Sequence, residues 1–164
     1  MNNIYLIGMP GCGKSTIGKI ISGEINMAFV DLDKYIVNTV GEDIEKMFER
    51  GEPYFRARET ECLKRVSELE NTVIATGGGV VETFENYEIM KKTGRIVFID
   101  TPPENIISNS SLSGRPLLAG NKNRIFDIYK RRYHLYQKFC DISVENNGKI
   151  EEVTEKVIKH IKKL

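Results

Sequence analysis

The sequence lacks paired cysteines, long apolar runs and an excess of charge of either sign. Its three cysteines, Cys12, Cys62 and Cys140, are odd in number and far apart, which excludes a disulfide framework and a zinc site of regular spacing. No apolar run approaches the roughly 20 residues that span a bilayer, and no signal-peptide pattern opens the chain. The net charge of +1 gives no basic surface for nucleic acid or lipid. These absences predict a cytoplasmic protein with free thiols and small-molecule partners.

The length of 164 residues, with 40% hydrophobic and 29% charged residues, fits one globular domain over 1–164. No apolar stripe indicates an oligomer, so we expect a monomer. Short apolar runs rich in β-branched residues predict strands, at 4–7, 28–32, 73–75, 96–99 and 142–144. Amphipathic segments predict helices, at 15–25, 44–69, 85–91, 124–139 and 151–164. Their alternation predicts an α/β fold, a parallel sheet with helices on both faces.

The most specific motif is GMPGCGKST, residues 8–16, which lies between a predicted strand and a predicted helix. It fits the G-x-x-x-x-G-K-[ST] pattern of phosphate-binding loops, where backbone N–H groups and a helix N-terminus face phosphate oxygens. Lys14 would then reach the β- and γ-phosphates, and Ser15 would ligate Mg²⁺. Cys12 stands among the phosphate-facing amides, where any small residue serves. The alternative is a glycine-rich turn followed by an unrelated capping serine.

Phosphate-binding loops occur in GTPases, motor ATPases and small-molecule kinases, so other motifs must decide between them. Guanine recognition uses N-K-x-D, but residues 121–124 read NKNR, with Arg124 in the aspartate position. A D-x-x-G switch motif is also missing after the early strands. The sequence therefore disfavours a GTPase.

Two carboxylates, Asp31 and Asp33, end the second predicted strand in the segment FVDLD. Because side chains alternate along a strand, we expect both to point into the crevice at its carboxyl end, where α/β sheets bind ligands. One carboxylate would hold Mg²⁺ through its water shell and the other would bind an acceptor hydroxyl. A solvated turn after the strand is the alternative.

Three further segments favour a small acidic acceptor. In FRARE, Arg56 and Glu59 are three apart on one predicted helical face, so the carboxylate would orient the guanidinium toward an anionic ligand. Glycines 77–79 end an apolar run and permit close backbone approach to a ligand, although a loose turn has the same composition. Arg131 and Arg132 stand among aromatic residues of a predicted helix, where an ordinary solvated face is the alternative.

These motifs occur together in the order and spacing of one family. GMPGCGKST, FVDLD, FRARE, ATGGGVV, RPLL at 115–118 and RYHLY at 132–136 cover nearly the whole chain, which thereby resembles the shikimate kinases. Nucleotide kinases and gluconate kinases share the phosphate-binding loop but not the combined set of FR-x-x-E, GGG and RPLL. The resemblance implies three α/β/α layers with a five-stranded parallel sheet of order 2-3-1-4-5, a P-loop kinase fold with a mobile lid. It implies that ATP, with Mg²⁺, phosphorylates the shikimate 3-hydroxyl in aromatic amino-acid biosynthesis, giving shikimate 3-phosphate and ADP.

The resemblance also implies residue roles. Asp33 would bind shikimate hydroxyls and accept the transferred proton, with Lys14 and Arg115 as further catalytic residues. Asp31 would share Mg²⁺ with Ser15. The implied ATP-binding residues are Gly11, Cys12, Gly13, Lys14, Ser15, Thr16 and Arg115. The implied shikimate-binding residues are Asp33, Arg56, Gly77, Gly78, Gly79 and Arg132, in which the two arginines clamp the carboxylate.

Two regions are expected to complete the site. Residues 33–61 would form a helical shikimate-binding region. The polar residues 108–123 would form the lid, whose closure excludes water and brings Arg115 over the phosphates. A merely disordered loop is the alternative. Two departures from the family bear on nucleotide affinity and base selectivity: residues 105–110 lack the usual earlier lid arginine, and 146–149, the expected adenine loop, lacks a proline.

Two alternatives to this function remain at this stage. A kinase for another small polyol acid, such as gluconate, would also use an arginine pair for a carboxylate. A nucleotide-binding module that has lost turnover would keep the fold and bind ATP, but would release no ADP in response to an acceptor.

Overall fold

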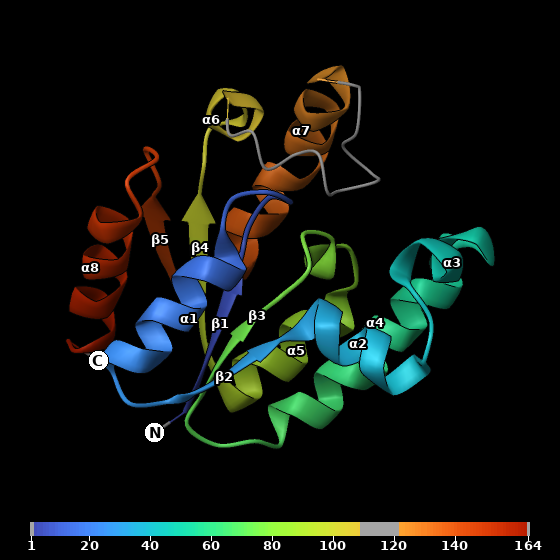
Figure 1. The fold of residues 1–164 in the computed structure, drawn as a ribbon, viewed down its shortest axis with the longest axis horizontal. Helices are drawn as coiled ribbons and strands as arrows, with labels where there is room; N and C mark the ends of the chain where they lie inside the picture. Colours follow the sequence, from blue (N-terminus) through green and yellow to red (C-terminus); the bar gives the residue numbers. More distant parts are fainter. Residues whose placement is uncertain (1, 109–121, 164) are drawn as a thin grey trace.

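The computed structural model of the protein describes residues 2–108 and 122–163. At its centre is an all-parallel, five-stranded sheet in the order β2-β3-β1-β4-β5, which confirms the order implied by the resemblance (Figure 1). The strands are β1 (Asn3–Ile7), β2 (Ala28–Asp31), β3 (Thr72–Ala75), β4 (Gly94–Asp100) and β5 (Ile142–Glu145). In the register of the sheet, Tyr5 of β1 pairs with Ile74 of β3 and Ile96 of β4.

The central strands β1 and β3 carry uninterrupted apolar runs, at 4–7 and 73–75, because both of their faces are covered. Every residue of β1 and of β3 is buried, as the uninterrupted apolar runs predict. The edge strand β2 remains partly exposed. The hydrophobic core therefore lies on both sides of β1 and fixes the strand that carries the phosphate-binding loop.

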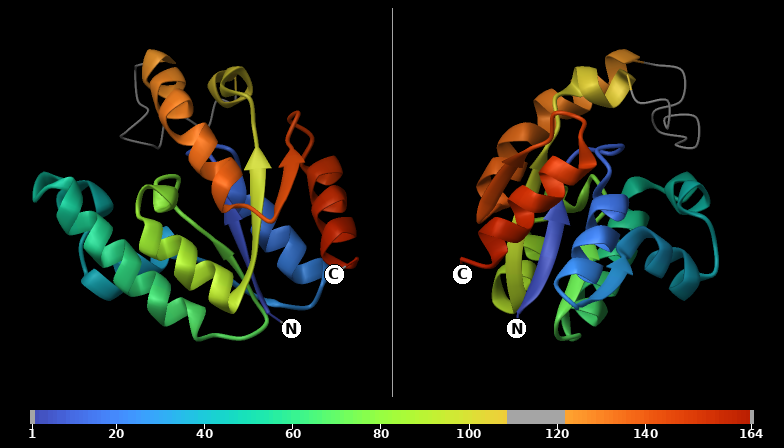
Figure 2. Two further views of the ribbon diagram at one scale, coloured as in Figure 1. Left: turned by 180° about the vertical axis from the view of Figure 1, so that it is seen from behind. Right: turned by 60° about the vertical axis from the view of Figure 1, so that its left-hand side comes forward.

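Helices form the two outer layers of the predicted three-layer fold. On one face lie α1 (Lys14–Glu24) and α8 (Ile150–Ile161), and on the other lie α4 (Glu52–Ser67), α5 (Phe84–Thr93) and α7 (Lys122–Phe139) (Figures 1 and 2). Four shorter elements are α2 (Leu32–Val40), α3 (Ile44–Glu49), the 3₁₀ turn η1 (Val80–Glu82) and α6 (Pro103–Ser108). Within 2–108 and 122–163, no helix has both the length and the apolar content that crossing a membrane requires.

Two predictions about the helices are wrong. The single helix predicted over 44–69 is two helices, because Gly51 has a left-handed φ of 109° and Pro53 stands in the first turn of α4. The strand predicted over 28–32 ends at Asp31, and an unpredicted helix, α2, begins at Leu32, so Asp33 does not lie on a strand. Asp31 ends β2 and caps α2 by accepting a hydrogen bond from the Lys34 amide, and Asp33 lies in the first turn of that helix.

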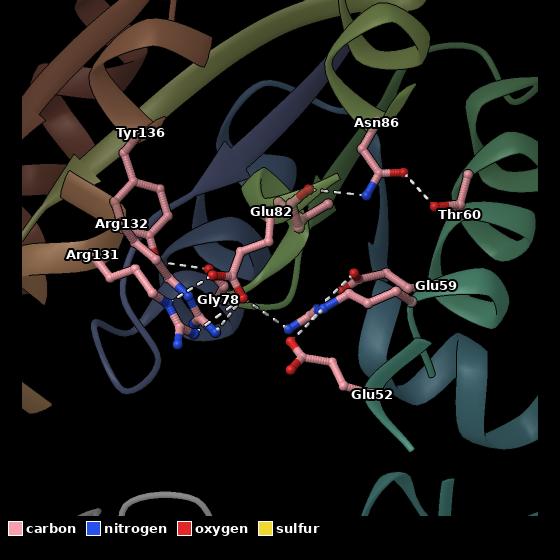
Figure 3. A network of polar contacts seen from close by, with 11 residues as sticks. Glu52, Glu59, Thr60, Gly78, Glu82, Asn86, Arg131, Arg132 and Tyr136 are labelled. Carbon is pink, nitrogen blue, oxygen red and sulfur yellow. Dashed lines mark hydrogen bonds and ion pairs between the residues drawn. The ribbon is translucent and has the colours of Figure 1, made fainter. Parts of the chain in front are cut away.

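A buried asparagine in α5 ties together the segments around the three-glycine turn. Asn86 is fully buried; its Oδ1 accepts a hydrogen bond from Thr60 of α4 at 2.8 Å, and its Nδ2 donates to the Val80 carbonyl at 2.9 Å (Figure 3). Asn86→Ala should lower the free energy of unfolding by about 2–4 kcal/mol, because two buried polar partners lose their hydrogen bonds. Urea denaturation measures this change. The exposed Asn38→Ala serves as control, and a loss below about 1 kcal/mol for Asn86→Ala would contradict the prediction.

Candidate active site

A cavity of about 490 Å³ lies at the carboxyl ends of the strands, where α/β folds bind ligands. The predicted site residues that line it are Gly13, Lys14, Ser15, Asp31, Asp33, Arg56, Gly77, Gly78, Gly79 and Arg132. Gly11, Cys12 and Thr16 belong to the same loop and helix without lining the cavity. Arg115 and most of the predicted lid, residues 109–121, lie outside the described residues.

The phosphate-binding loop needs glycine at defined positions. Gly11 and Gly13 have φ values of 83° and 88°, which residues with a Cβ rarely adopt, and Gly13 is the N-cap of α1. At Gly8 a Cβ would lie 2.7 Å from the Ile99 carbonyl oxygen of the neighbouring strand β4. The loop is therefore pressed against the sheet, with the N-terminus of α1 opening into the cavity.

Lys14 is folded back over its own loop. Its Nζ donates to the carbonyl oxygens of Gly8 at 2.8 Å and Met9 at 2.9 Å, and lies 3.6 Å from the Cys12 Sγ. Lys14 as a whole is only 6% exposed. A buried ammonium group held by carbonyl oxygens is a cation that a phosphate can attract.

Ser15 and Asp31 form an oxygen pair beside this lysine. The Ser15 hydroxyl donates to Asp31 Oδ2 at 2.6 Å, which supports the prediction that these two side chains lie at one metal position. Hydroxyl and carboxylate oxygens fit Mg²⁺, which takes one or two protein ligands and completes its shell with water and substrate phosphates. Among the described residues, no group of three or more histidine, cysteine, aspartate or glutamate side chains is arranged to hold a metal alone.

Gly77 lets two carboxylates approach the strand end. A Cβ at this position would lie 2.8 Å from Asp33 Oδ1 and 3.2 Å from Glu59 Oε2. Asp33 and Glu59 come from α2 and α4, so two of the three helices in the predicted substrate region meet the end of β3 here. Any larger residue at Gly77 would push one carboxylate out of place.

Arg56 is surrounded by carboxylates. Its Nη1 donates to Glu59 Oε1 at 2.8 Å, which confirms the predicted contact, and its Nε donates to Glu52 Oε1 at 3.3 Å. The guanidinium lies directly over Gly79, where a Cβ would be 2.1 Å from the Arg56 Nη2. Only glycine at this position leaves room for the arginine at the wall of the cavity.

Glu59, which holds Arg56, is completely buried. Burial raises its pKa to about 7, although the charge and hydrogen bond of Arg56 act in the opposite direction. Its Oε1 binds Arg56, and its Oε2 is a buried oxygen without a hydrogen-bond partner among the described residues. Glu59 therefore places an acceptor, close to Asp33, at the base of the cavity.

Helix α7 brings the second predicted arginine to the same cavity. Arg132 is 6% exposed and its Nη2 contacts Glu82 Oε2 at 3.1 Å (Figure 3). One turn later, the Tyr136 hydroxyl donates to the Gly78 carbonyl at 2.6 Å. Burial is the main reason that the pKa of Tyr136 is raised, so this hydroxyl stays protonated and keeps donating. Helix α7 thus fixes both an arginine and the three-glycine turn.

The predicted adenine loop lies next to the phosphate-binding loop. Asn146 is buried; its Nδ2 donates to the Cys12 carbonyl at 3.1 Å and to Thr101 Oγ1 at 3.0 Å. Its Oδ1 accepts from the Gly148 amide at 3.1 Å. One side chain therefore ties the loop after β5 to the loop after β1.

Sequence reasoning missed part of the cavity wall. Ile44, Phe48 and Phe55 form an apolar side, and the two phenylalanine rings stack with their centroids 4.5 Å apart. Their apolar character was the available signal, but the single amphipathic helix predicted over 44–69 gave no reason to place them at the cavity. Glu82, which contacts Arg132, carried no sequence signal at all.

Comparisons with known proteins agree with this geometry. A family model for shikimate kinase matches residues 10–162. The chain is 49% identical over 160 residues to a shikimate kinase of Clostridium botulinum (strain Alaska E43 / Type E3), covering 98% of this chain and 97% of that protein. A structure of shikimate kinase from Acinetobacter baumannii in complex with shikimate matches with a TM-score of 0.93 at 32% identity, covering 99% of this chain and 94% of that one.

A second solved structure, shikimate kinase from Aquifex aeolicus, matches with a TM-score of 0.83 at 38% identity and covers 98% of this chain and 96% of that one. Sequence and structure comparisons therefore agree over almost the full length of both partners. The sheet order and the phosphate-binding loop are those expected from the resemblance. The chain belongs to the shikimate kinase family, whose members are small-molecule kinases with ATP as co-substrate.

Proposed function

We propose that the protein transfers the γ-phosphoryl group of ATP to the 3-hydroxyl of shikimate, giving shikimate 3-phosphate and ADP, in aromatic amino-acid biosynthesis. One observation carries the assignment of the site: a single cavity is lined by a phosphate-binding loop, by carboxylates that include Asp33, and by two arginines from different helices. Donor and acceptor then bind side by side. Phosphoryl transfer needs mainly such positioning and charge stabilisation, so few reactive side chains are required.

The donor side consists of residues 11–16. The loop amides and the N-terminus of α1 bind the β- and γ-phosphates. Lys14 exchanges the carbonyl oxygens of Gly8 and Met9 for phosphate oxygens, since it now donates to both carbonyls. Its charge then stabilises the negative charge that spreads over the transferred group.

The acceptor side binds the shikimate carboxylate through Arg56 and Arg132, joined by backbone groups of Gly78 and Gly79. Guanidinium groups suit this ligand because their donors form a planar fork that matches a carboxylate. The bond from Tyr136 to the Gly78 carbonyl holds the glycine turn in one orientation. The apolar wall of Phe48 and Phe55 packs against the ring of the substrate.

Asp33 binds the reacting hydroxyl. As the hydroxyl oxygen bonds to the γ-phosphorus and the bond to the β,γ-bridging oxygen breaks, the hydroxyl proton passes to the Asp33 carboxylate and then to solvent. In a loose transition state this proton leaves late, so a strongly basic group is not required.

Mg²⁺ is the proposed metal, held by Ser15 and Asp31 together with ATP phosphates. When bound, it neutralises charge on the β- and γ-phosphates. The short distance of 2.6 Å between the two side chains supports this assignment. We also assign 33–61 to acceptor binding and 108–123, with Arg115, to a lid that excludes water; most of this lid lies outside the described residues.

The experiment that tests the function is coupled ADP release with ATP and Mg²⁺, with and without shikimate. Shikimate should stimulate release strongly, gluconate and nucleoside monophosphates should not, and a chelator should abolish turnover. Equal stimulation by gluconate would replace the proposed acceptor with another polyol acid. ATP binding without acceptor-dependent release would identify a binding module instead.

We propose that the protein acts as a cytoplasmic monomer. Its three free cysteines suit a reducing compartment, and its exposed large apolar residues are scattered over several elements in the described part of the chain. Light scattering on the same preparation should give the mass of one chain; the mass of a dimer would contradict the proposal.

A further inference from the structure

Glu82 ends η1, three residues after the three-glycine turn, and contacts three guanidinium groups (Figure 3). Its Oε1 lies 2.9 Å from the Arg131 Nε. Its Oε2 lies 3.2 Å from the Arg131 Nη2, 3.1 Å from the Arg132 Nη2 and 3.5 Å from the Arg56 Nη2. One oxygen atom therefore bridges the two arginines that face the acceptor, although these come from α4 and α7.

Glu82 lies behind these arginines as seen from the cavity. Arg56 and Arg132 are among the described residues that line the cavity, and Glu82 is not. Each guanidinium carries five N–H donors, and Glu82 contacts only the Nη2 of each group. At Arg56, Nε and Nη1 also contact Glu52 and Glu59, which leaves the second N–H of each Nη group for a ligand. Glu82 and a bound carboxylate therefore use different N–H donors of the arginines.

The positive charges of Arg56 and Arg132 explain why an anion is needed between them. The side chains of Arg56 and Arg132 are only 14% and 7% exposed, so water screens their mutual repulsion poorly. Burial alone would raise the pKa of Glu82, but Arg132, Arg131 and Arg56 outweigh it and lower the pKa below its ordinary value. Glu82 is thus a negative charge between two positive charges that water reaches poorly.

Arg131 holds Glu82 in this orientation. Its side chain is 59% exposed, and its Nε and Nη2 contact the two different oxygens of Glu82, which is the bidentate arrangement of an arginine–carboxylate pair. Such a pair fixes the plane of the carboxylate. The direction of Oε2 toward Arg56 and Arg132 follows from that plane.

We propose that Glu82 is a positioning residue for substrate recognition: it fixes Arg56 and Arg132 at the spacing that the acceptor carboxylate needs, and Arg131 fixes Glu82. The identity of that acceptor rests on the proposed function. An arginine pair that is ordered before binding loses less conformational freedom when the carboxylate arrives, so the benefit is in acceptor affinity.

Glu82→Gln tests this role, because it keeps the shape of the side chain and removes its charge. The KM for shikimate should rise about 10-fold or more, the loss expected for hydrogen bonds to a charged group, while kcat and the KM for ATP stay within about twofold. The control is Glu85→Gln, three residues further along the chain. The Glu85 carboxylate pairs with Lys64 outside the cavity, so this change should leave kcat and both KM values unchanged. An unchanged KM for shikimate would overturn the proposal, and a lower one would show that Glu82 competes with the substrate.

Two further measurements test the role of Glu82: one changes an exposed side chain, which avoids folding defects, and the other needs no acceptor. Arg131→Ala changes an exposed side chain and should raise the KM for shikimate in the same direction, by about threefold, because Glu82 loses its bidentate partner. In the ligand-free protein, NMR of guanidinium ¹⁵N signals should show hindered rotation of Arg132 that Glu82→Gln releases. Arg56 should change less, because Glu59 and Glu52 also hold it. If the wild type released no ADP with shikimate, the proposed function would fail, but the NMR signals would still test the role of Glu82. Equal rotation in the wild type and in Glu82→Gln would refute the positioning role.

Discussion

Lys14→Ala should lower kcat about 10²–10³-fold, the loss expected when a charged group that stabilises the transition state is removed. The reason is its position: the Lys14 ammonium lies at the N-terminus of α1, in the loop whose amides face the phosphates, and Ser15 follows it directly. Steady-state ADP release with saturating ATP and shikimate measures the effect. The KM for ATP should rise as well, because the same charge binds the ground state.

The control for this variant is Lys19→Ala, on the exposed side of the same helix, which should retain full activity. The Lys14→Ala protein should remain folded, with a thermal unfolding temperature about 2–8 °C below that of the wild type, because the buried carbonyls of Gly8 and Met9 lose a hydrogen-bond partner. A folded Lys14→Ala protein with normal kcat would refute the assignment of residues 8–16 as the phosphate-binding loop.

Arg56→Ala should raise the KM for shikimate about 100-fold, which corresponds to about 2.7 kcal/mol, and should change the KM for ATP by less than about threefold. Truncation removes one arm of the carboxylate clamp and leaves the phosphate-binding loop intact. It also leaves Glu59 buried without its cation, so the pKa of Glu59, already raised to about 7, should rise further and the carboxyl should bind a proton. Initial rates over a matrix of both substrate concentrations measure the two KM values.

A companion variant separates charge from geometry. Arg56→Lys keeps the positive charge beside Glu59 but loses the fork, so its KM for shikimate should fall between those of the wild type and Arg56→Ala. Arg58→Ala is the matched control on the same helix, because Arg58 pairs with Glu61 on the surface and does not line the cavity. Equal increases in the KM for shikimate and for ATP would remove Arg56 from the clamp.

The fold was predictable because its signals are local and repeated. The apolar run at 4–7 lies on β1, which is buried at every position, and the motif GMPGCGKST joins β1 to α1 as the pattern requires. The order of the strands could not be predicted in the same way, because the alternation of strands and helices predicts only that the sheet is parallel. The positions of β3 and β4 on either side of β1 came from the resemblance, since no local pattern encodes which strands are neighbours.

The site was predictable where chemistry dictates residue type. Lys14, Asp33 and Arg56 belong to recognisable motifs, and all three line the cavity. The strand geometry assumed for Asp33 was wrong, because the hydrogen bond by which Asp31 caps α2 turns FVDLD into a helix start that an alternating pattern conceals. Glu82 could not be found from the sequence, because its importance comes from arginines on two distant helices.

The link that Asn146 makes between the loops after β1 and β5 joins parts of the chain that are synthesised far apart. Together with the cavity, which draws on residues from Pro10 to Arg132, it means that no partly folded state holds a complete binding site. Substrates therefore select the fully folded protein by mass action, and a concentration of 100 times the dissociation constant would add about 2.7 kcal/mol to its stability. In a cell, the supply of substrates would thus set the lifetime of the protein against proteolysis as well as its flux.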